Sequence, residues 1–525
     1  MKRLIILLAA SLLTATQLHA AARPRLIVQI IVGSMRAEEL DRYAANFCND
    51  GFLRLRRGGT EYLDSRYEYQ QTTTPVSLAT LTTGAMPSTH GVIGTRWQNY
   101  TENRTVRLLD GRQGCGPYNL IAPTLAQTME QQLEGSRQVS IAAEATSAVV
   151  MAGKGGEAFW LDSLSCGWSS STYYEPILPA WIERSNREGF NRSYLDATWR
   201  TLLSPDEYVN TRSFDIELSG AQRGKERIRR AGQGPELRTD LDRMLYSPAG
   251  NTAVLGFAKQ AIAQFRLGAD ETPDLLNICL DASRRITEAY GPESIEAEDM
   301  YYRLDRDLAD FLTFLFAQVK DGNVTVVLTS DHGTSPSYDA GPEPLERFNT
   351  RQFEVIVNSF LNARYGSGDW LLAYEDQCIY LNHNLVYERG LNLSEVQNEV
   401  AIFAMQFRGV SHALSATAMR TSYFGSGYAQ RMQNSFYPRR SGDVIINLMP
   451  GWIEEHDHKR SSSGSMYGYD TRVPLIFYGA GILPRQIDRP VDMTAVAPTL
   501  CRLLGIEAPA ASEGTVLEEV ISSNI

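Results

Sequence analysis

Short runs of mostly apolar residues recur along this chain and constrain its fold more than any other feature. The first run, Leu26–Val32, ends at Gly33. The others stand at Val139–Ala143, Leu275–Leu280, Val324–Thr329, Val444–Leu448 and Pro474–Tyr478. A strand with one face in water alternates polar and apolar residues, so these runs predict strands buried on both faces, as in a parallel sheet.

Amphipathic segments separate these runs. Met300–Val319 carries its apolar side chains on one helical face, and Thr494–Leu504 stops at Gly505, as a helix with a glycine C-cap does. Strands that alternate with helices predict an α/β fold with a mostly parallel central sheet and helices on both faces. Ligands bind such sheets at the carboxyl ends of the strands.

Two stretches break this alternation. Residues from about 168 to about 250 are rich in Trp, Tyr, Arg and Asp without a buried strand, and residues from about 345 to about 440 carry a mixed pattern of their own. We expect both to be cap insertions on a single domain that spans residues 21–525.

The charge balance narrows the function classes. Fifty Lys and Arg against 61 Asp and Glu give a net charge of −11, whereas nucleic-acid binders are usually basic, so no nucleic-acid partner is expected. An acidic surface repels phosphate esters, so a phosphate site would need local cations. The six cysteines include no C-x-x-C pair, which excludes a cysteine-rich zinc site but leaves any disulfide pairing open.

The first residues predict export. Lys2 and Arg3 precede the apolar run Leu4–Leu13, and small residues follow up to Ala20, as in a secretory signal peptide spanning residues 1–20. The run is too short to cross a membrane, which takes about 20 apolar residues. We therefore expect a periplasmic or extracellular protein without a transmembrane anchor.

One pair of residues at the end of a predicted strand suggests metal chemistry. Asp331 and His332 follow the run Val324–Thr329, and carboxylate and imidazole are both zinc ligands. The alternative is a loop aspartate that caps a helix beside an unrelated histidine.

Five ordered landmarks carry a resemblance to a known family. They are Thr83–Gly91, Tyr290–Glu296, Ser330–Gly333, Tyr469–Phe477 and Met493–Ile506. In these segments the chain resembles the alkaline phosphatase superfamily, both the exported monomeric phosphate-irrepressible alkaline phosphatases and the type I phosphodiesterase/nucleotide pyrophosphatases. The resemblance implies a monomeric phosphoric ester hydrolase with two zinc ions and a Thr or Ser nucleophile.

The resemblance assigns roles to individual positions. The nucleophile position is Thr74, and two of the six zinc-ligand positions keep a ligand, Asp331 and His332. The other four carry Gly33, Arg284, Glu288 and Ser463, and the three phosphate-clamp positions carry Thr95, Glu144 and Thr146. Without the family, Thr74 is equally well explained as a helix N-cap ahead of Pro75, and His90 as a structural residue of its turn.

These replacements predict a pseudoenzyme. We expect a phosphatase/phosphodiesterase homologue that has lost two-zinc hydrolysis, holds no metal or one weakly bound divalent ion, and binds an unknown ligand or protein partner. The alternative is an active phosphomonoesterase or phosphodiesterase with a Thr74 nucleophile and a reduced or relocated metal site. Substitute ligands would then come from Glu288, Asp281, His456 or His458. A third interpretation makes the two insertions the functional surface.

Overall fold

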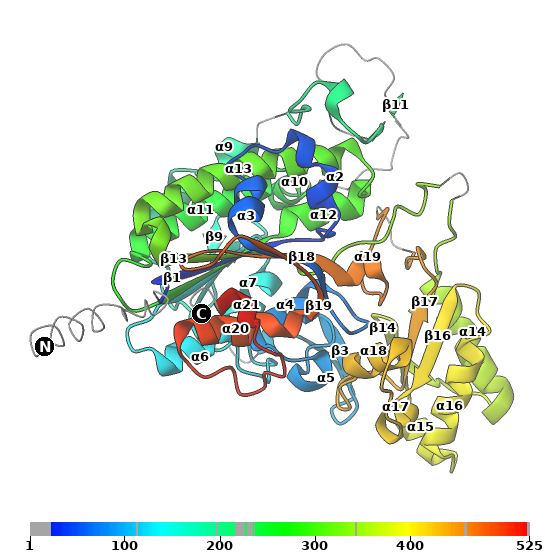
Figure 1. Cartoon of the computed structure of the whole chain (residues 1–525). Helices are drawn as coiled ribbons and strands as arrows, with labels where there is room; N and C mark the ends of the chain where they lie inside the picture. The colour runs from blue at the N-terminus through cyan, green and yellow to red at the C-terminus, as the bar shows by residue number, and fades with distance from the viewer. Residues whose placement is uncertain are drawn as a thin grey trace, which may run out of the picture.

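A nine-stranded sheet forms the centre of the computed structural model (Figure 1). The model describes residues 23–111, 114–195, 198–214, 216, 226–227, 235, 237–341, 344–455 and 459–521. The sheet has the order β19-β2-β18-β13-β1-β12-β7-β8-β9. Its strands are β1 Leu26–Val32, β2 Thr60–Arg66, β7 Gln138–Ala142, β8 Glu157–Leu161, β9 Trp168–Ser169, β12 Asp274–Leu280, β13 Val324–Thr329, β18 Arg472–Gly479 and β19 Arg485–Asp492.

All of these strands except β9 and β18 run in one direction. The predicted α/β fold with a mostly parallel sheet is therefore confirmed. The run Pro474–Tyr478 was expected to be parallel and instead forms most of the antiparallel β18. Its residues read as unbroken apolar because helices cover the sheet on both sides, whatever the strand direction.

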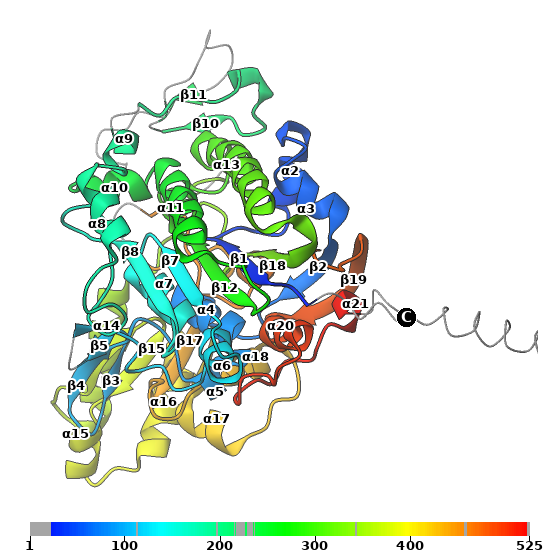
Figure 2. The same cartoon turned by 90° about the vertical axis from the view of Figure 1, so that its left-hand side faces the viewer.

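Helices cover both faces of the sheet (Figure 2). One face carries α3 Phe52–Gly58, α10 Asp240–Leu245, α11 Ala249–Phe265, α12 Asp281–Tyr290 and α13 Ile295–Val319. The other carries α4 Thr74–Thr83, α6 Leu125–Gln132, α7 Ala145–Ala152 and α20 Val496–Leu504. In β1, Val28 and Ile30 enter the first core and Ile27 and Ile31 the second, as the two-residue period of a strand requires. Both predicted helices are confirmed, and Gly505 ends α20 in the left-handed conformation.

A smaller antiparallel sheet stands beside the main body, at the lower right of Figure 1. Its order is β14-β15-β17-β16, with β14 Leu371–Glu375, β15 Cys378–Leu381, β16 Val410–Ser415 and β17 Val444–Leu448. Helices α14 Thr350–Tyr365 and α16 Leu393–Ala404 share its core.

The expectation that Val444–Leu448 is a parallel strand was wrong, because this run is β17 of the small sheet. Its residues other than Asn447 are apolar because Val444, Ile446 and Leu448 face the core of the small sheet while Ile445 joins the main core.

The remaining elements are short. They are α2 Glu39–Arg42, η1 Ala44–Asn46, α5 Pro87–His90, β3 Arg96–Asn99, β4 Arg104–Arg107, β5 Asp110–Gly111, β6 Gly114–Cys115, α8 Ala180–Arg187, α9 Arg192–Leu195, η2 Pro205–Glu207, β10 Arg212–Ser213, β11 Glu226–Arg227, η3 Asp321–Asn323, α15 His383–Glu388, α17 Ala416–Thr421, α18 Gly427–Ser435, α19 Gly468–Thr471, η4 Met493–Ala495 and α21 Glu518–Ile521. The assignment of the two stretches near 168–250 and 345–440 as insertions stays a prediction.

The structure bears on two of the remaining sequence predictions. None of the helices in the described part of the chain is long and apolar enough to cross a membrane. The predicted signal peptide, residues 1–20, lies outside the described residues. All six cysteines lie within them and none forms a disulfide.

Candidate functional site

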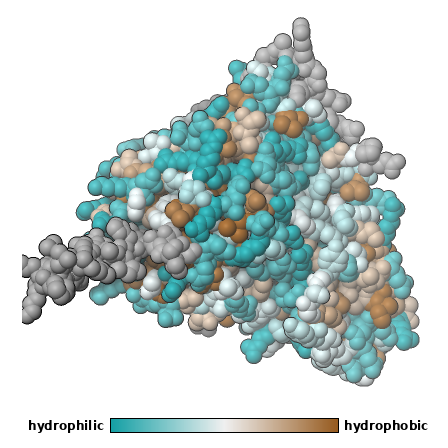
Figure 3. Space-filling model, viewed as in Figure 1, coloured by the Kyte–Doolittle hydropathy of each residue, from teal (hydrophilic) through white to brown (hydrophobic). Residues whose placement is uncertain are grey.

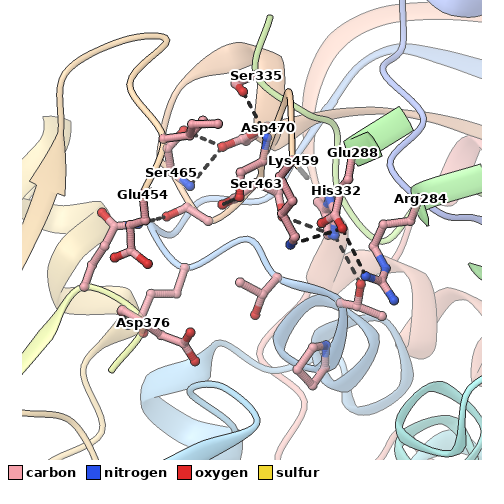
Figure 4. A pocket seen from close by; sticks show the side chains of 18 of the residues that line it. Arg284, Glu288, His332, Ser335, Asp376, Glu454, Lys459, Ser463, Ser465 and Asp470 are labelled. Atoms are coloured by element: carbon pink, nitrogen blue, oxygen red, sulfur yellow. Dashed lines mark hydrogen bonds and ion pairs between the residues drawn. The ribbon is translucent and has the colours of Figure 1, made fainter. Parts of the chain in front are cut away.

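A polar cavity of about 380 Å³ opens where the carboxyl ends of the central strands meet the small sheet (Figure 4). Its position agrees with the rule for ligand sites in α/β sheets. Positions assigned from the sequence line it together, namely Thr74, Thr95, Glu144, Thr146, Arg284, Glu288, His332 and Ser463. Asp331 and Gly33 lie directly behind this wall, where Asp331 bonds to Thr74 and Gly33 contacts Arg284.

The two retained ligand positions and the nucleophile position form one cluster. The Thr74 hydroxyl donates to Asp331 Oδ2 at 2.6 Å and lies 3.2 Å from His332 Nε2. His332 Nε2 is 3.3 Å from Asp331 Oδ2 and 3.4 Å from Ser463 Oγ. The backbone N–H groups of Ser34 and His332 each donate to Asp331 Oδ1 at 2.9 Å. The structure therefore places these predicted positions in contact with one another.

The N-cap interpretation of Thr74 was wrong. Helix α4 begins at Thr74, with Pro75 in its first turn, and Thr73 is the capping position. Because the Thr74 hydroxyl is directed at Asp331 and His332, it serves the cluster and not the helix terminus.

The ring of His332 is held in one orientation. Its Nδ1 lies 2.6 Å from the carbonyl oxygen of Gly333, and a carbonyl only accepts, so Nδ1 carries the hydrogen. In the neutral ring, Nε2 then presents its lone pair toward Thr74 and Ser463.

Arg284 stands at the centre of a salt-bridge chain. Glu144 accepts from Arg284 and Arg285, each at 2.6 Å, and Glu288 pairs with Lys459 at 3.1 Å and with Arg284 at 3.6 Å. Burial raises the pKa of Glu288, but the attraction of Lys459 and Arg284 outweighs it and lowers this pKa to about 2. Glu288 is therefore an anion already neutralised by protein cations.

Gly33 fits the approach of α12 to the end of β1. A Cβ added to Gly33 would lie 2.9 Å from Arg284 Cβ and 3.1 Å from the carbonyl oxygen of Leu280. These separations are shorter than ordinary van der Waals contact. An aspartate at this position would require α12 to move.

Two other residues considered from the sequence, Asp281 and His90, do not join the site. Asp281 accepts from the Ser147 hydroxyl at 2.6 Å and from the N–H of Glu144 at 2.9 Å, so it faces α7. His90 is buried beside Thr80, and burial lowers its pKa to about 3, which supports the structural interpretation. His456 and His458 lie outside the described residues.

The model of the type I phosphodiesterase / nucleotide pyrophosphatase family matches residues 27–470. The chain belongs to this family. Alkaline phosphatase PafA of Elizabethkingia meningoseptica is 28% identical over 536 residues, covering 98% of both chains. A Myroides odoratus protein named "Calcium-transporting ATPase" is 29% identical over 520 residues, 95% of both chains. The crystal structure of wild type PafA matches with a TM-score of 0.86 and 26% identity over 95% of this chain and 99% of that chain. These matches confirm the resemblance to the alkaline phosphatase superfamily.

Type I phosphodiesterases normally bind divalent metal ions, and the described residues that line this cavity do not fit a two-ion site. A guanidinium at Arg284 and a hydroxyl at Ser463 stand where the family resemblance implies metal ligands. Within the described ranges, no three His, Cys, Asp or Glu side chains are grouped so as to hold a metal ion. Asp331 and His332 offer a single ion two strong ligands, whereas zinc sites in proteins have three or four.

Sequence reasoning missed several residues that line the cavity. Asp376 and Gln377 form the two-residue turn between β14 and β15, both with positive φ, 46° and 62°. Such hairpin turns favour Asn-Gly, because glycine adopts positive φ without strain. The sequence Asp-Gln carries no turn signal, and Lys459 and Glu454 belong to no family landmark, so only the structure could reveal them.

Proposed function

We propose that this type I phosphodiesterase family member has lost two-zinc phosphoester hydrolysis and that its cavity binds a ligand. The proposal rests on Arg284. Its guanidinium, fixed by Glu144, occupies a metal-ligand position, and it would repel a divalent ion about 4 Å away by roughly several kcal/mol at an effective ε of about 20. Glu144 also places a carboxylate at a phosphate-clamp position, where a cation would stabilise the transferring group.

One observation favours a second candidate, a hydrolase with a single metal ion. Thr74 Oγ1, Asp331 Oδ2 and His332 Nε2 lie 2.6 to 3.3 Å from one another, close enough to ligate one ion. Thr74 would then keep the role of nucleophile. The substrate would be a phosphomonoester or a phosphodiester.

Zinc content and turnover test the two candidates together. The zinc bound per purified chain is measured by plasma mass spectrometry, and hydrolysis of p-nitrophenyl phosphate and bis-p-nitrophenyl phosphate is followed at alkaline pH with and without added zinc. We expect well under one zinc per chain and no turnover that depends on Thr74. The variants are Thr74→Ala and Asp331→Ala, with Thr313→Ala on the exposed face of α13 as the matched control.

Two bound zinc ions with turnover abolished by Thr74→Ala would refute the proposed loss of activity. One bound zinc with turnover lost in both Thr74→Ala and Asp331→Ala would establish the single-metal hydrolase. We also propose that residues 1–20 are removed on export and that the mature protein is a monomer.

A further inference from the structure

A second groove, of about 630 Å³, opens where the hairpin of β3 and β4 meets the segment between α18 and β17. One side of it comes from residues 97–106 and 119–121, and the other from residues 437–440. Among the described residues, none lines both this groove and the cavity around Thr74. The groove is therefore a separate candidate site.

The side chain of Arg440 is held in one position within this groove. Its Nη1 donates to the carbonyl oxygen of Gly91 at 2.6 Å, and its Nη2 donates to that of Asn119 at 2.9 Å. The guanidinium carbon lies 4.4 Å from the centroid of the Trp97 ring, which is a cation–π contact. The cation is therefore in place before any ligand arrives.

The charge of Arg440 has no counter-ion in the described part of the chain. No described carboxylate forms a salt bridge with it. Burial lowers the pKa of this guanidinium, and the group that opposes the effect is the Tyr437 phenol, not a carboxylate. Burial and then the charge of Arg440 lower the pKa of His90 to about 3. Because a half-buried charge without a counter-ion is costly, an anionic ligand would offset that cost.

Arg440 keeps N–H donors for such a ligand. A guanidinium carries five N–H groups, and the two carbonyl contacts use two of them. The N–H at Nε has no acceptor among the described residues, and Nε is not one of the buried unpaired nitrogen atoms. This donor is therefore open to a ligand in the groove.

The lining of the groove carries an excess of positive charge. Among its described residues, three arginines stand against one acidic side chain, Glu102, which pairs with Arg104 at 2.6 Å. Arg439 is exposed and, like Arg440, has no carboxylate partner within the described ranges. Two guanidinium groups are thus available to bind an anion, and their planar shape matches a carboxylate.

Uncharged polar groups of the groove suit a ligand with hydroxyl groups. The amide nitrogen of Asn119 donates to the carbonyl oxygens of Arg107, Leu108 and Asp110 at 3.0 to 3.2 Å. Its Oδ1 accepts from no described residue and is not a buried unpaired atom, and the same holds for the Tyr437 hydroxyl. Both oxygens can therefore accept from a ligand hydroxyl.

We propose that this groove binds an acidic saccharide, a sugar that carries a carboxylate. The carboxylate would accept from Arg440 and Arg439, and the sugar hydroxyls would bond to Asn119 Oδ1 and the Tyr437 hydroxyl. The volume of about 630 Å³ lies within the range of small-molecule sites, about 300–1,000 Å³.

Calorimetric titration of the full chain with three sugars tests the charge of the ligand. The probes are D-glucuronate, D-glucose and D-glucosamine, which share a pyranose ring and differ in charge. We expect glucuronate to bind about tenfold or more tightly than either of the others. The absence of glucuronate binding, or equal binding of glucose or glucosamine, would overturn the proposal.

A fourth probe separates the sugar from its carboxylate. Cyclohexanecarboxylate has a six-membered ring and a carboxylate but no hydroxyl group. We expect it to bind about tenfold more weakly than glucuronate, because the hydrogen bonds to Asn119 and Tyr437 are lost. Equal binding would show a general carboxylate site and would overturn the assignment to a sugar.

Substitutions locate the site. Arg440→Lys keeps the charge but loses the planar guanidinium, and Arg439→Gln removes an exposed charge, so each should weaken glucuronate binding about tenfold. The matched control is Arg107→Gln, an exposed arginine of β4 that does not line the groove, and it should leave binding within about twofold. Circular dichroism shows whether Arg440→Lys folds, and Arg439→Gln keeps the test open if it does not. Unchanged binding in the folded variants would contradict the proposal.

Sugar binding at this groove is independent of metal binding and turnover at the cavity. Thr74→Ala should leave glucuronate binding within about twofold, because the two sites share no described lining residue. A large loss of glucuronate binding in Thr74→Ala would place the sugar in the cavity and overturn the assignment to the groove. Two bound zinc ions with turnover would refute only the proposed loss of hydrolysis.

Discussion

Gly33 links a missing metal ligand to the packing of the fold. The glycine removes the carboxylate that the family resemblance implies, and α12 packs so close to it that a Cβ would lie 2.9 Å from Arg284 Cβ. The loss of the ligand and the approach of the helix are therefore one structural change. Restoring the aspartate alone would not rebuild a metal site.

The substitution Gly33→Ala tests this contact. Overfilling a packed contact of this kind typically costs about 1–3 kcal/mol, so we expect a loss of that size in the free energy of unfolding. Urea denaturation measures it. Gly322→Ala is the control, because a Cβ there meets nothing within 4 Å. An equal effect at both positions would refute the close-packing argument.

The side chain of Asp470 gives the protein a pH-dependent stability. Burial raises the pKa of Asp470 from 3.8 to about 7, and Oδ1 has no hydrogen-bond partner. The folded state keeps the proton where the unfolded chain has released it. The contribution of Asp470 to the free energy of unfolding is therefore fully present below about pH 4. It decreases as the pH rises to about 7 and does not change further above that pH.

Asp470→Asn should remove this contribution. Between about pH 4.5 and about pH 7.5 the wild-type protein should lose roughly 3 kcal/mol more unfolding free energy than the variant. Denaturant titrations at the two pH values measure the difference. Asp488→Asn, on the exposed face of β19, should behave like the wild type. Parallel curves for wild type and Asp470→Asn would contradict the assignment.

At the scale of elements, Glu144 joins α7 to α12. It precedes α7 and binds Arg284 and Arg285 of α12, and their attraction outweighs burial and lowers its pKa. The link places a guanidinium and a carboxylate at positions where the family resemblance implies a metal ligand and a phosphate-clamp residue. Both guanidinium groups form an ion pair of 2.6 Å with this one carboxylate.

Glu144→Gln should therefore be strongly destabilising. Removing one partner of a largely buried ion pair typically costs about 3–5 kcal/mol, because the remaining charges stay unpaired. Thermal and urea unfolding measure the loss. Glu102→Gln, in an exposed pair with Arg104, is the control and should cost about 1 kcal/mol or less. A loss at Glu144 no larger than at Glu102 would show that the link carries little energy.

The strand predictions are correct where a strand that is buried on both faces is also parallel to its neighbours. The runs at Leu26, Leu275 and Val324 are central parallel strands, as expected. The prediction of a parallel strand at Val444 was wrong, because β17 is covered on both faces although it belongs to an antiparallel sheet. An apolar pattern indicates how many faces of a strand are buried. It does not indicate which strand lies alongside or in which direction that strand runs.

At the scale of the molecule, the family landmarks located Thr74, Asp331, His332 and the replaced positions around them. They could not locate Lys459 or the turn at Asp376, which reach the cavity only through the folding of distant segments. Residues at positions shared with a family can be predicted from the sequence. Contacts that are specific to one chain, such as that of Lys459, cannot be predicted in this way.

The face of the molecule drawn in Figure 3 is largely hydrophilic, as we expect for the proposed exported monomer. Figure 3 shows a largely hydrophilic face on which apolar residues are scattered, and large exposed apolar side chains such as Leu164, Ile177 and Tyr423 belong to separate segments.

Mass spectrometry of the secreted protein should give a chain that begins at Ala21. Sedimentation should give a single species somewhat below the 58.5 kDa of the full chain. A dimer in solution, or an intact N-terminus in the exported fraction, would contradict the proposal.

The cavity draws its walls from segments far apart in the chain, so binding is one of the last properties the protein acquires. Thr74 meets Asp331 across 257 residues, and Ser463 meets His332 across 131. A nascent chain that has emerged only as far as β13 has neither Ser463 nor Lys459 nor any strand of the small sheet. A chain synthesised only as far as β13 therefore cannot form the complete cavity.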